Sequence, residues 1–217
     1  MLSPDQSAIV FQGSNMTDAP ILIRSVEILS DDWAILKKFT FDYRRRDGSL
    51  ERQVRQTYDR GHGAVILPYD PERGTVLLVR QFRLPAYVSG HPEPLIEACA
   101  GLLDRDDPET CIRREAQEEL GYRLRDVEPV FHVFMSPGSV TERLMFFIAR
   151  YSPDDRIGQG GGDRHEGEDI EVLELSLEEA YGMIGRGGII DGKTIMLLQH
   201  LKLKGSMQDR GRSGRPA

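Results

Sequence analysis

The chain has 217 residues, of which 39% are hydrophobic and 29% are charged, and its formal net charge is −7. This length and composition are typical of one globular domain, with or without a small extension, that folds without disulfides or a structural metal. The acidic balance argues against broad nucleic-acid binding. The sequence has no apolar run long enough to span a membrane and no secretory signal pattern, so we expect a cytoplasmic protein with no membrane association.

The two cysteines, Cys99 and Cys111, both stand among apolar residues. Their spacing is poor for zinc, and no neighbouring His or Cys pair supplies further ligands. The sequence therefore predicts two buried free thiols in a reducing compartment.

The N-terminal part is expected to hold a flexible leader, residues 1–19, and then a β subdomain, residues 20–60. Its antiparallel strands are predicted at 20–29, 33–43 and 50–58, with a turn signal at 46–49. Three strands alone form a small core. We therefore expect this subdomain to pack against the rest of the chain or to form a dimer interface.

Residues 61–203 are expected to form the main domain, followed by a flexible tail, residues 204–217. Residues 152–168 are rich in Gly, Asp, Arg and Glu, which predicts a long mobile loop. The expected strands are 63–68, 75–82, 94–99, 130–135, 144–151 and 170–175, and the expected helices are 108–120, 176–185 and 193–203.

The helix over 108–120 has both ends marked in the sequence. Asp107 is a natural N-cap, Pro108 suits the first helical position, and Gly121 suits the left-handed residue that follows a helix.

Three glutamates lie on this helix, Glu115, Glu118 and Glu119. Offsets of three and four residues predict that they share one face. Carboxylates crowded near a helix C-terminus repel one another and oppose the helix dipole, although Arg113 and Arg114 compensate in part. A divalent cation that prefers oxygen ligands would reverse this penalty. The spacing by itself also fits a solvated acidic helix face.

The segment Arg114-Glu115-Ala116-Gln117-Glu118-Glu119-Leu120-Gly121-Tyr122 resembles the second half of the box that defines the Nudix hydrolases. The match continues upstream to Gly101, with one departure. The usual box has one more residue between its first Gly and its Arg, and here Asp107 stands near the place of a customary Glu. This leaves the role of Asp107 open but does not affect the helix.

The resemblance implies roles for the residues of the box. Glu115 and Glu119 would bind Mg²⁺, or Mn²⁺, and Ala100 would contribute its backbone carbonyl. Arg114 would orient the glutamates, and Glu118 would either hold a metal, directly or through water, or pair with Arg114. The residues Ala100, Gly101 and Leu102 would also line the substrate site.

Further segments resemble the GDP-mannose pyrophosphatase branch of this family, with the ADP-ribose pyrophosphatases as close relatives. The resemblance implies an α+β fold, a Nudix α/β/α sandwich with a mixed β-sheet plus N-terminal antiparallel strands, and a homodimer joined through those strands. The segments that carry it are 58–61, 80–83, 99–104, 135–138, 160–162, 166–172 and 191–194.

The acidic loop before the strand at 170–175 carries Glu166, Glu168 and Asp169. Composition alone fits ordinary loop solvation. The family pattern makes Glu166 the general base, Glu168 a further metal ligand and Gly167 a substrate contact. A base on a closing loop activates water only after substrate has bound. His165 is a less favoured candidate base.

Substrate contacts follow from the same resemblance. Arg80 and Arg83 would meet phosphate, because guanidinium groups suit phosphate oxygens. A surface salt bridge is the alternative for Arg83, and a buried core position is the alternative for Trp33, which would otherwise stack on the base. The remaining expected contacts are Arg55, Glu142, which would accept from a sugar hydroxyl, and Lys193.

We therefore expect a Mg²⁺-dependent pyrophosphatase that converts GDP-mannose to GMP and mannose 1-phosphate. One alternative is hydrolysis of ADP-ribose to AMP and ribose 5-phosphate. Another is a non-catalytic Nudix-fold regulator that binds nucleotides, but the complete set Arg114, Glu115, Glu118 and Glu119 argues against it.

Overall fold

A computed structural model of the chain describes residues 20–103 and 106–213, without the side chains of Glu166 and of residues 206–213. The predicted leader, residues 1–19, lies outside the described residues. The chain divides into two compact units, Met1–Arg60 and Gly61–Ala217. Each unit is described by itself.

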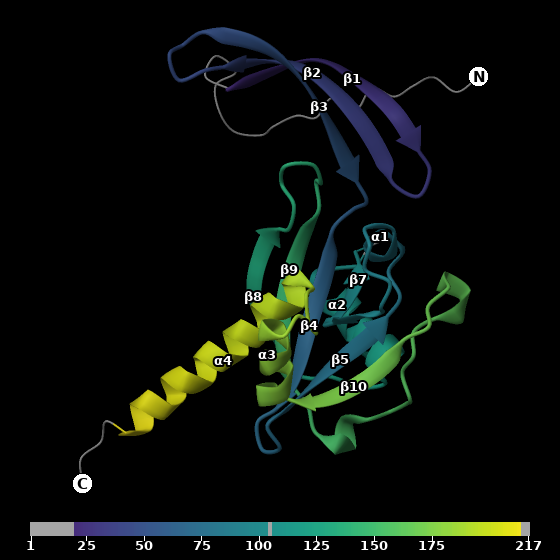
Figure 1. The fold of residues 1–217 in the computed structure, drawn as a ribbon, viewed down its shortest axis with the longest axis vertical. Coiled ribbons are helices and arrows are strands. Elements are labelled where there is room, and N and C mark those ends of the chain that lie inside the picture. The colour runs from purple at the N-terminus through teal and green to yellow at the C-terminus, as the bar shows by residue number, and fades with distance from the viewer. Residues whose placement is uncertain (1–19, 104–105, 214–217) are drawn as a thin grey trace. The chain divides into compact units, whose positions relative to one another are not determined.

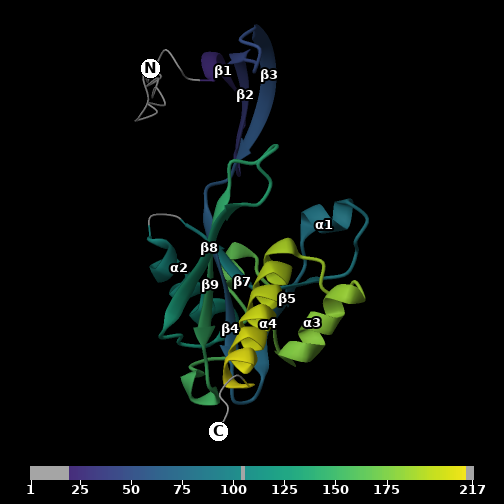
Figure 2. The same ribbon diagram turned by 90° about the vertical axis from the view of Figure 1, so that its left-hand side faces the viewer.

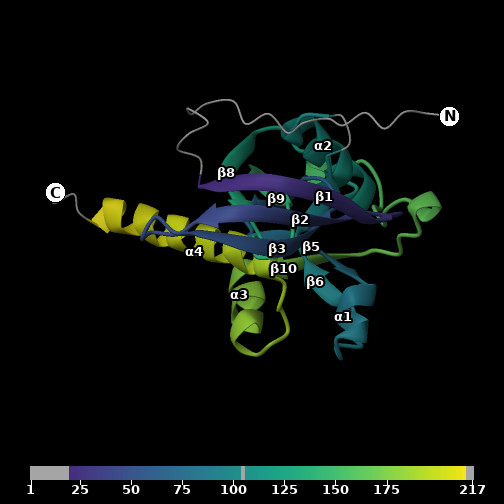
Figure 3. The ribbon, with the colours of Figure 1, turned by 90° about the horizontal axis from the view of Figure 1, so that it is seen from above.

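The first unit is a three-stranded antiparallel sheet of β1 (Ile21–Asp31), β2 (Ile35–Arg44) and β3 (Leu50–Asp59), with β2 in the middle (Figure 3). This confirms the three predicted strands. Asp42 on β2 joins them, because it accepts hydrogen bonds from Arg24 on β1 (2.7 Å) and Arg52 on β3 (2.9 Å). Many of the large apolar side chains remain exposed, among them Leu22, Val26, Ile28 and Val54.

The second unit is built on a mixed seven-stranded sheet. Five of its strands follow the order β10-β5-β4-β9-β8, and the other two, β6 and β7, pair with β5 and β4. β4 and β9 pair in parallel, and the other neighbours are antiparallel. β4 reads as an almost continuous apolar run because it is buried on both faces. The strands are β4 (Gly63–Asp70), β5 (Thr75–Gln81), β6 (Leu95–Glu97), β7 (Cys99–Leu102), β8 (Val127–Phe134), β9 (Arg143–Arg150) and β10 (Glu171–Ser176).

Helices cover both faces of this sheet (Figures 1 and 2). Helix α2 (Pro108–Glu115) lies on one face, and α3 (Leu177–Gly185) and α4 (Gly192–Ser213) lie on the other. Alternate residues of β4 feed two separate cores: Ala64 and Ile66 pack toward α2, whereas Val65 and Leu67 pack toward α3 and α4. The α/β/α sandwich with a mixed sheet is thereby confirmed. None of the helices in the described ranges is long and apolar enough to cross a membrane.

The predicted strand at 94–99 is in fact two strands that join different neighbours. β6 pairs with β5, and β7 pairs with β4, so the chain changes partner at Ala98. The backbone N–H of Ala98 donates to Thr194 Oγ1 at 2.7 Å, which places the start of α4 against this change of partner.

Two further features differ from the expectations. A short helix, α1 (Leu84–Val88), forms with Pro85 in its first turn, where a missing N–H is tolerated. Helix α4 continues to Ser213, although the sequence predicts its end at Leu203 and a flexible tail from 204. Lys204 holds the first part of this extension by bonding Glu128 of β8 at 2.7 and 2.8 Å.

The packing of α4 leads to a stability prediction. Leu198 is fully buried in the core on this side of the sheet. We expect Leu198→Ala to lower the free energy of unfolding by about 2–5 kcal/mol, because truncation removes buried apolar surface and leaves a cavity. Leu203 on the same helix is 60% exposed, so Leu203→Ala is the matched control with little effect. Equal losses for the two variants in urea unfolding would contradict the assigned packing.

Candidate metal and substrate site

Helix α2 starts at the predicted residue, and the predicted end at Leu120 is the end of a wider helical turn that continues α2. Asp107 caps the start by accepting from the backbone N–H groups of Glu109 and Thr110, each at 3.1 Å. This gives Asp107 a structural role. After Glu115 the helix passes into a π-helical turn, Ala116–Leu120, which ends at Gly121 with φ of 77°. Such turns are rare and occur frequently at functional sites.

The prediction that Glu115, Glu118 and Glu119 share one face is wrong. The side chain of Glu115 is 14% exposed, Glu119 is 1% exposed, and Glu118 is exposed. The physical reason is the π-helical turn, which changes the angular step between these residues. Glu119 is thus turned into the domain, whereas Glu118 points outward.

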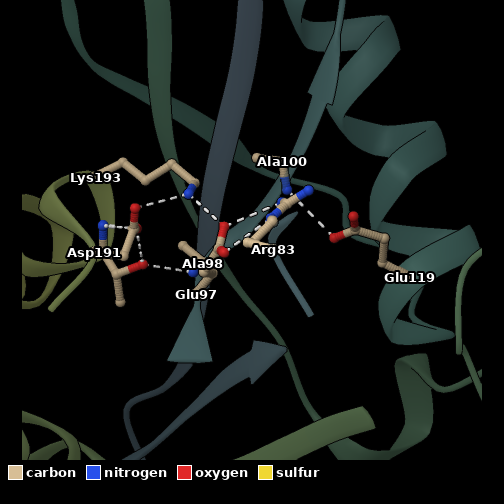
Figure 4. Close-up of polar contacts among 8 residues, drawn as sticks. Arg83, Glu97, Ala98, Ala100, Glu119, Asp191 and Lys193 are labelled. Carbon is tan, nitrogen blue, oxygen red and sulfur yellow. Dashed lines mark hydrogen bonds and ion pairs between the residues drawn. The ribbon is translucent and has the colours of Figure 1, made fainter. Parts of the chain in front are cut away.

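Glu119 lies against β7, where it accepts a hydrogen bond from the backbone N–H of Ala100 at 3.3 Å (Figure 4). Burial is the main cause that raises the pKa of Glu119 to about 8. A hydrogen bond with the Cys99 thiol acts in the opposite direction, and the charges of Glu168 and Glu115 raise the pKa further. Three carboxylates from the helix and the acidic loop therefore influence one another.

Gly101 allows Glu115 to pack against β7. A Cβ atom at this position would lie 2.3 Å from Cδ and 2.4 Å from Cγ of Glu115. The neighbouring Arg114 forms an ion pair with Glu115, with its Nη2 atom 3.3 Å from Glu115 Oε1. Burial acts to lower the pKa of Arg114, but the charges of Glu115 and Glu118 outweigh it and raise the pKa.

The glycine-rich part of the loop after β9 is tied to the end of the helix. The N–H groups of Gly161 and Gly162 donate to the carbonyls of Glu119 (2.9 Å) and Glu118 (3.1 Å). The last carbonyl groups of a helix have no hydrogen-bond donors within the helix, and the N–H groups of this loop serve as their donors. Gly160 is required by close approach, since a Cβ there would lie 2.3 Å from the carbonyl oxygen of Glu119.

The acidic loop brings Glu168 toward the helix. Its Oε2 atom accepts from the backbone N–H of Asp163 at 2.9 Å, and its charge raises the pKa of Glu119. Gly167, with φ of 77°, closes the turn Arg164–Glu166. The side chain of Glu166 lies outside what the structure describes.

A divalent cation fits this set of side chains. Within the described residues, no group of three or more His, Cys, Asp or Glu side chains is already close enough to hold a metal ion. Mg²⁺, however, usually takes only one or two protein carboxylates and completes its shell with substrate phosphates and water. The buried Glu119 carboxylate, disfavoured in its charged form beside Glu115 and Glu168, is a donor that a cation would stabilise.

Arg83 and Lys193, both predicted substrate contacts, are brought together by a residue that the sequence analysis did not single out (Figure 4). Glu97 accepts two bonds from Arg83 and one from Lys193. Asp191 accepts from Lys193 and from Thr194. The available signal was a single carboxylate within the apolar strand segment Leu95-Ile96-Glu97-Ala98-Cys99.

The other predicted contacts are placed separately. Arg80 bonds Glu171 across β5 and β10 at 2.8 Å, and Glu142 follows the turn at Ser136. Trp33 and Arg55 belong to the first unit. Trp33 is 75% exposed, so the alternative of a buried core tryptophan is wrong for this chain.

Both cysteines are buried and free, as predicted. Burial is the main cause that raises the pKa of each thiol. Neither thiol is therefore activated as a nucleophile.

Comparison with known proteins matches nearly the whole described chain. A family model described as the GDP-mannose pyrophosphatase NudK N-terminal domain matches residues 20–58, and a NUDIX domain model matches residues 59–198. A GDP-mannose pyrophosphatase of Pectobacterium atrosepticum is 55% identical over 86% of this chain and 96% of its own length. Proteins of the same name from Cronobacter sakazakii and Yersinia pestis are 50% and 51% identical, over 83% and 82% of this chain and 94% and 89% of their own lengths.

The contact between Gly101 and Glu115 leads to a prediction with an internal rescue. Gly101→Ala should lower the free energy of unfolding by about 0.5–1.5 kcal/mol, because the added Cβ overlaps the Glu115 side chain and displaces it from its rotamer. In a Glu115→Ala background the overlapping atoms are gone, so the same substitution should be nearly neutral. Gly138→Ala is the control, since a Cβ there meets nothing within 4 Å. A loss that persists undiminished in the Glu115→Ala background would contradict the close contact.

Proposed function

Because the chain belongs to the Nudix family, we propose that it hydrolyses the diphosphate bond of GDP-mannose and releases GMP and mannose 1-phosphate. The observation that carries this proposal is the buried Glu119 carboxylate, placed beside β7 and influenced by Glu115 and Glu168. The choice of substrate is supported by the names of relatives that are 50–55% identical over most of the chain.

Catalysis depends on a divalent metal ion, as is general in this family, and we assign it as Mg²⁺, with Mn²⁺ able to replace it. The side chains of Glu115, Glu119 and Glu168 and the backbone carbonyl of Ala100 would hold the ion. When bound, the ion neutralises the diphosphate and lowers the pKa of the attacking water.

The chain's own residues supply the base and orient the acids. Glu166 takes the proton of the attacking water, and its place in the loop couples this step to substrate binding. Arg114 holds Glu115 in place through the 3.3 Å contact between their side chains. Glu118 completes the catalytic set by its charge interaction with Arg114.

The substrate is held by charged and polar groups. Arg83 and Lys193 meet the phosphates, with Arg80 nearby in sequence, and Glu142 accepts from a sugar hydroxyl. The backbone of Ala100, Gly101 and Leu102, together with Gly167, lines the site. The buried free thiols support a cytoplasmic location for the enzyme.

The proposal is tested with a nucleotide-sugar panel in the presence and absence of Mg²⁺. GDP-mannose should be cleaved with the highest kcat/KM, and ¹⁸O-water should label one phosphate product. Cleavage at the sugar–phosphate bond would overturn the reaction type. A higher kcat/KM for ADP-ribose would overturn only the choice of substrate.

Glu119→Gln should lower kcat by about 10³-fold, because loss of a metal ligand's charge removes electrostatic stabilisation of the transition state. Glu109→Gln, at the exposed start of the same helix, is the control and should keep the wild-type rate. Steady-state kinetics at saturating Mg²⁺ provide the measurement. An unchanged kcat for Glu119→Gln would refute its assignment as a ligand.

The acidic loop gives a prediction that separates base from ligand. Glu166→Gln should reduce kcat much more than it raises KM, because a general base acts in the transition state. Glu168→Gln should also raise the Mg²⁺ concentration needed for half-maximal rate. His165→Ala tests the alternative base. If only this variant lost activity, the assignment of Glu166 would fail.

We also propose that the protein is a homodimer joined through residues 20–60. The support is the exposed apolar surface of the N-terminal sheet, including Val26 and Ile28, which a three-stranded sheet cannot bury by itself. Light scattering at micromolar concentration should give twice the chain mass, and Ile28→Lys should weaken association. A wild-type protein that is monomeric under these conditions would count against the dimer.

A further inference from the structure

Glu97, the last residue of β6, is a buried carboxylate that binds two cations from distant parts of the chain (Figure 4). Its side chain is 2% exposed. Oε1 accepts from Arg83 Nε at 2.9 Å, and Oε2 accepts from Arg83 Nη2 at 3.1 Å. Oε2 also accepts from Lys193 Nζ at 2.5 Å. Glu97 therefore connects Arg83, the residue before α1, with the first turn of α4.

Such a carboxylate is stable in the interior only while both partners remain. A buried charge carries a large desolvation penalty unless it is paired and fully hydrogen-bonded. Burial acts to raise the pKa of Glu97, but Arg83 and Lys193 outweigh it and leave the pKa below its usual value. Glu97 is thus charged at neutral pH, and its charge holds Arg83 and Lys193 in fixed positions.

The side chains of Asp191 and Thr194, which lie beyond Lys193, are fixed as well. Asp191 Oδ1 accepts from Lys193 Nζ at 2.9 Å, and Asp191 Oδ2 accepts from Thr194 Oγ1 at 2.6 Å. Thr194 Oγ1 in turn accepts from the Ala98 N–H. Lys193 is consequently held between two carboxylates, and the start of α4 is attached to the segment that leads to Ala100.

The arrangement leaves donors for an anion. Arg83 uses Nε and Nη2 on Glu97, so the Nη1 edge of its guanidinium faces away from that carboxylate, and its side chain is 41% exposed. Glu119, on the other side of Ala100, lies near enough for its charge to raise the pKa of Arg83, against the opposing effect of burial. Arg83 thus lies between Glu97 and the helical turn that carries Glu119.

We propose that Glu97 is a positioning residue that fixes Arg83 and Lys193 as one two-cation clamp for the phosphates of the nucleotide sugar. This inference rests on the proposed function. The two cations are balanced by the two carboxylates Glu97 and Asp191. The clamp therefore acts through the fixed direction of its donors and not through excess positive charge, so its main contribution is orientation of the reacting phosphate.

The proposal predicts that Glu97→Gln lowers kcat strongly and changes KM only slightly. Loss of the charge frees both cations, which keeps attraction for the substrate but removes alignment. We expect kcat to fall by about 10- to 100-fold, as for small misplacements of reacting groups, while KM changes by less than about 3-fold. Glu93→Gln, an exposed acid just before β6, is the control and should behave as wild type.

A double-mutant cycle separates positioning from general destabilisation. In an Arg83→Ala/Lys193→Ala background, Glu97→Gln should lower kcat by less than about 3-fold, because the groups through which it acts are absent. If Glu97→Gln does not unfold cooperatively, Glu97→Asp replaces it in the same cycle, since it keeps the charge but cannot reach both cations equally.

Two results would overturn the proposal: wild-type kcat in the Glu97 variant, or an equal loss of kcat in both backgrounds. Both leave hydrolysis by the wild-type chain intact and so refute the positioning role alone. A wild type that cleaves ADP-ribose but not GDP-mannose would refute the substrate assignment, and the cycle would then be measured with ADP-ribose.

Discussion

Two buried carboxylates, Glu97 and Glu119, lie on either side of the segment that leads into β7, and the rest of the site depends on how each is compensated. Each residue as a whole is 1% exposed. Glu97 is matched by two protein cations, which hold its pKa below the usual value against the effect of burial. Glu119 has hydrogen bonds only with the Ala100 N–H and the Cys99 thiol among the causes that lower its pKa, and burial raises that pKa to about 8. The first carboxylate is thereby a fixed internal ion, whereas the charged form of the second would be stabilised by a cation.

The change of strand partner at Ala98 connects the surroundings of these two carboxylates. Because β6 joins β5 and β7 joins β4, the segment crosses between strands, and the Ala98 N–H bonds Thr194. That bond attaches the start of α4, with Lys193, close to Ala100, with its contact to Glu119. A single irregularity in the sheet therefore connects the helices that cover its two opposite faces.

The π-helical turn and the glycine loop form the other half of the site. The turn directs Glu119 inward and Glu118 outward, and the loop amides of Gly161 and Gly162 bind the carbonyls at its end. The same loop continues to Glu168, so the acids of the helix and of the loop are held by one set of backbone hydrogen bonds. This arrangement explains why three carboxylates that repel one another can remain in proximity.

The sequence by itself determined the positions of most strands and helices, the start of the helix at Pro108 and, through the resemblance of its motif, the family with its sandwich fold. Apolar periodicity, the Asp107 cap and the Arg114–Gly121 motif are local signals, which can be recognised without knowledge of the tertiary structure. The tertiary structure alone decided which glutamate is buried, because the angular step of a π-helical turn depends on packing against β7 and the loop. It alone decided the roles of Glu97 and Asp191, because their partners lie far away in sequence. The role of a carboxylate within an apolar strand cannot be predicted from the sequence, because only the fold brings the neutralising cations beside it.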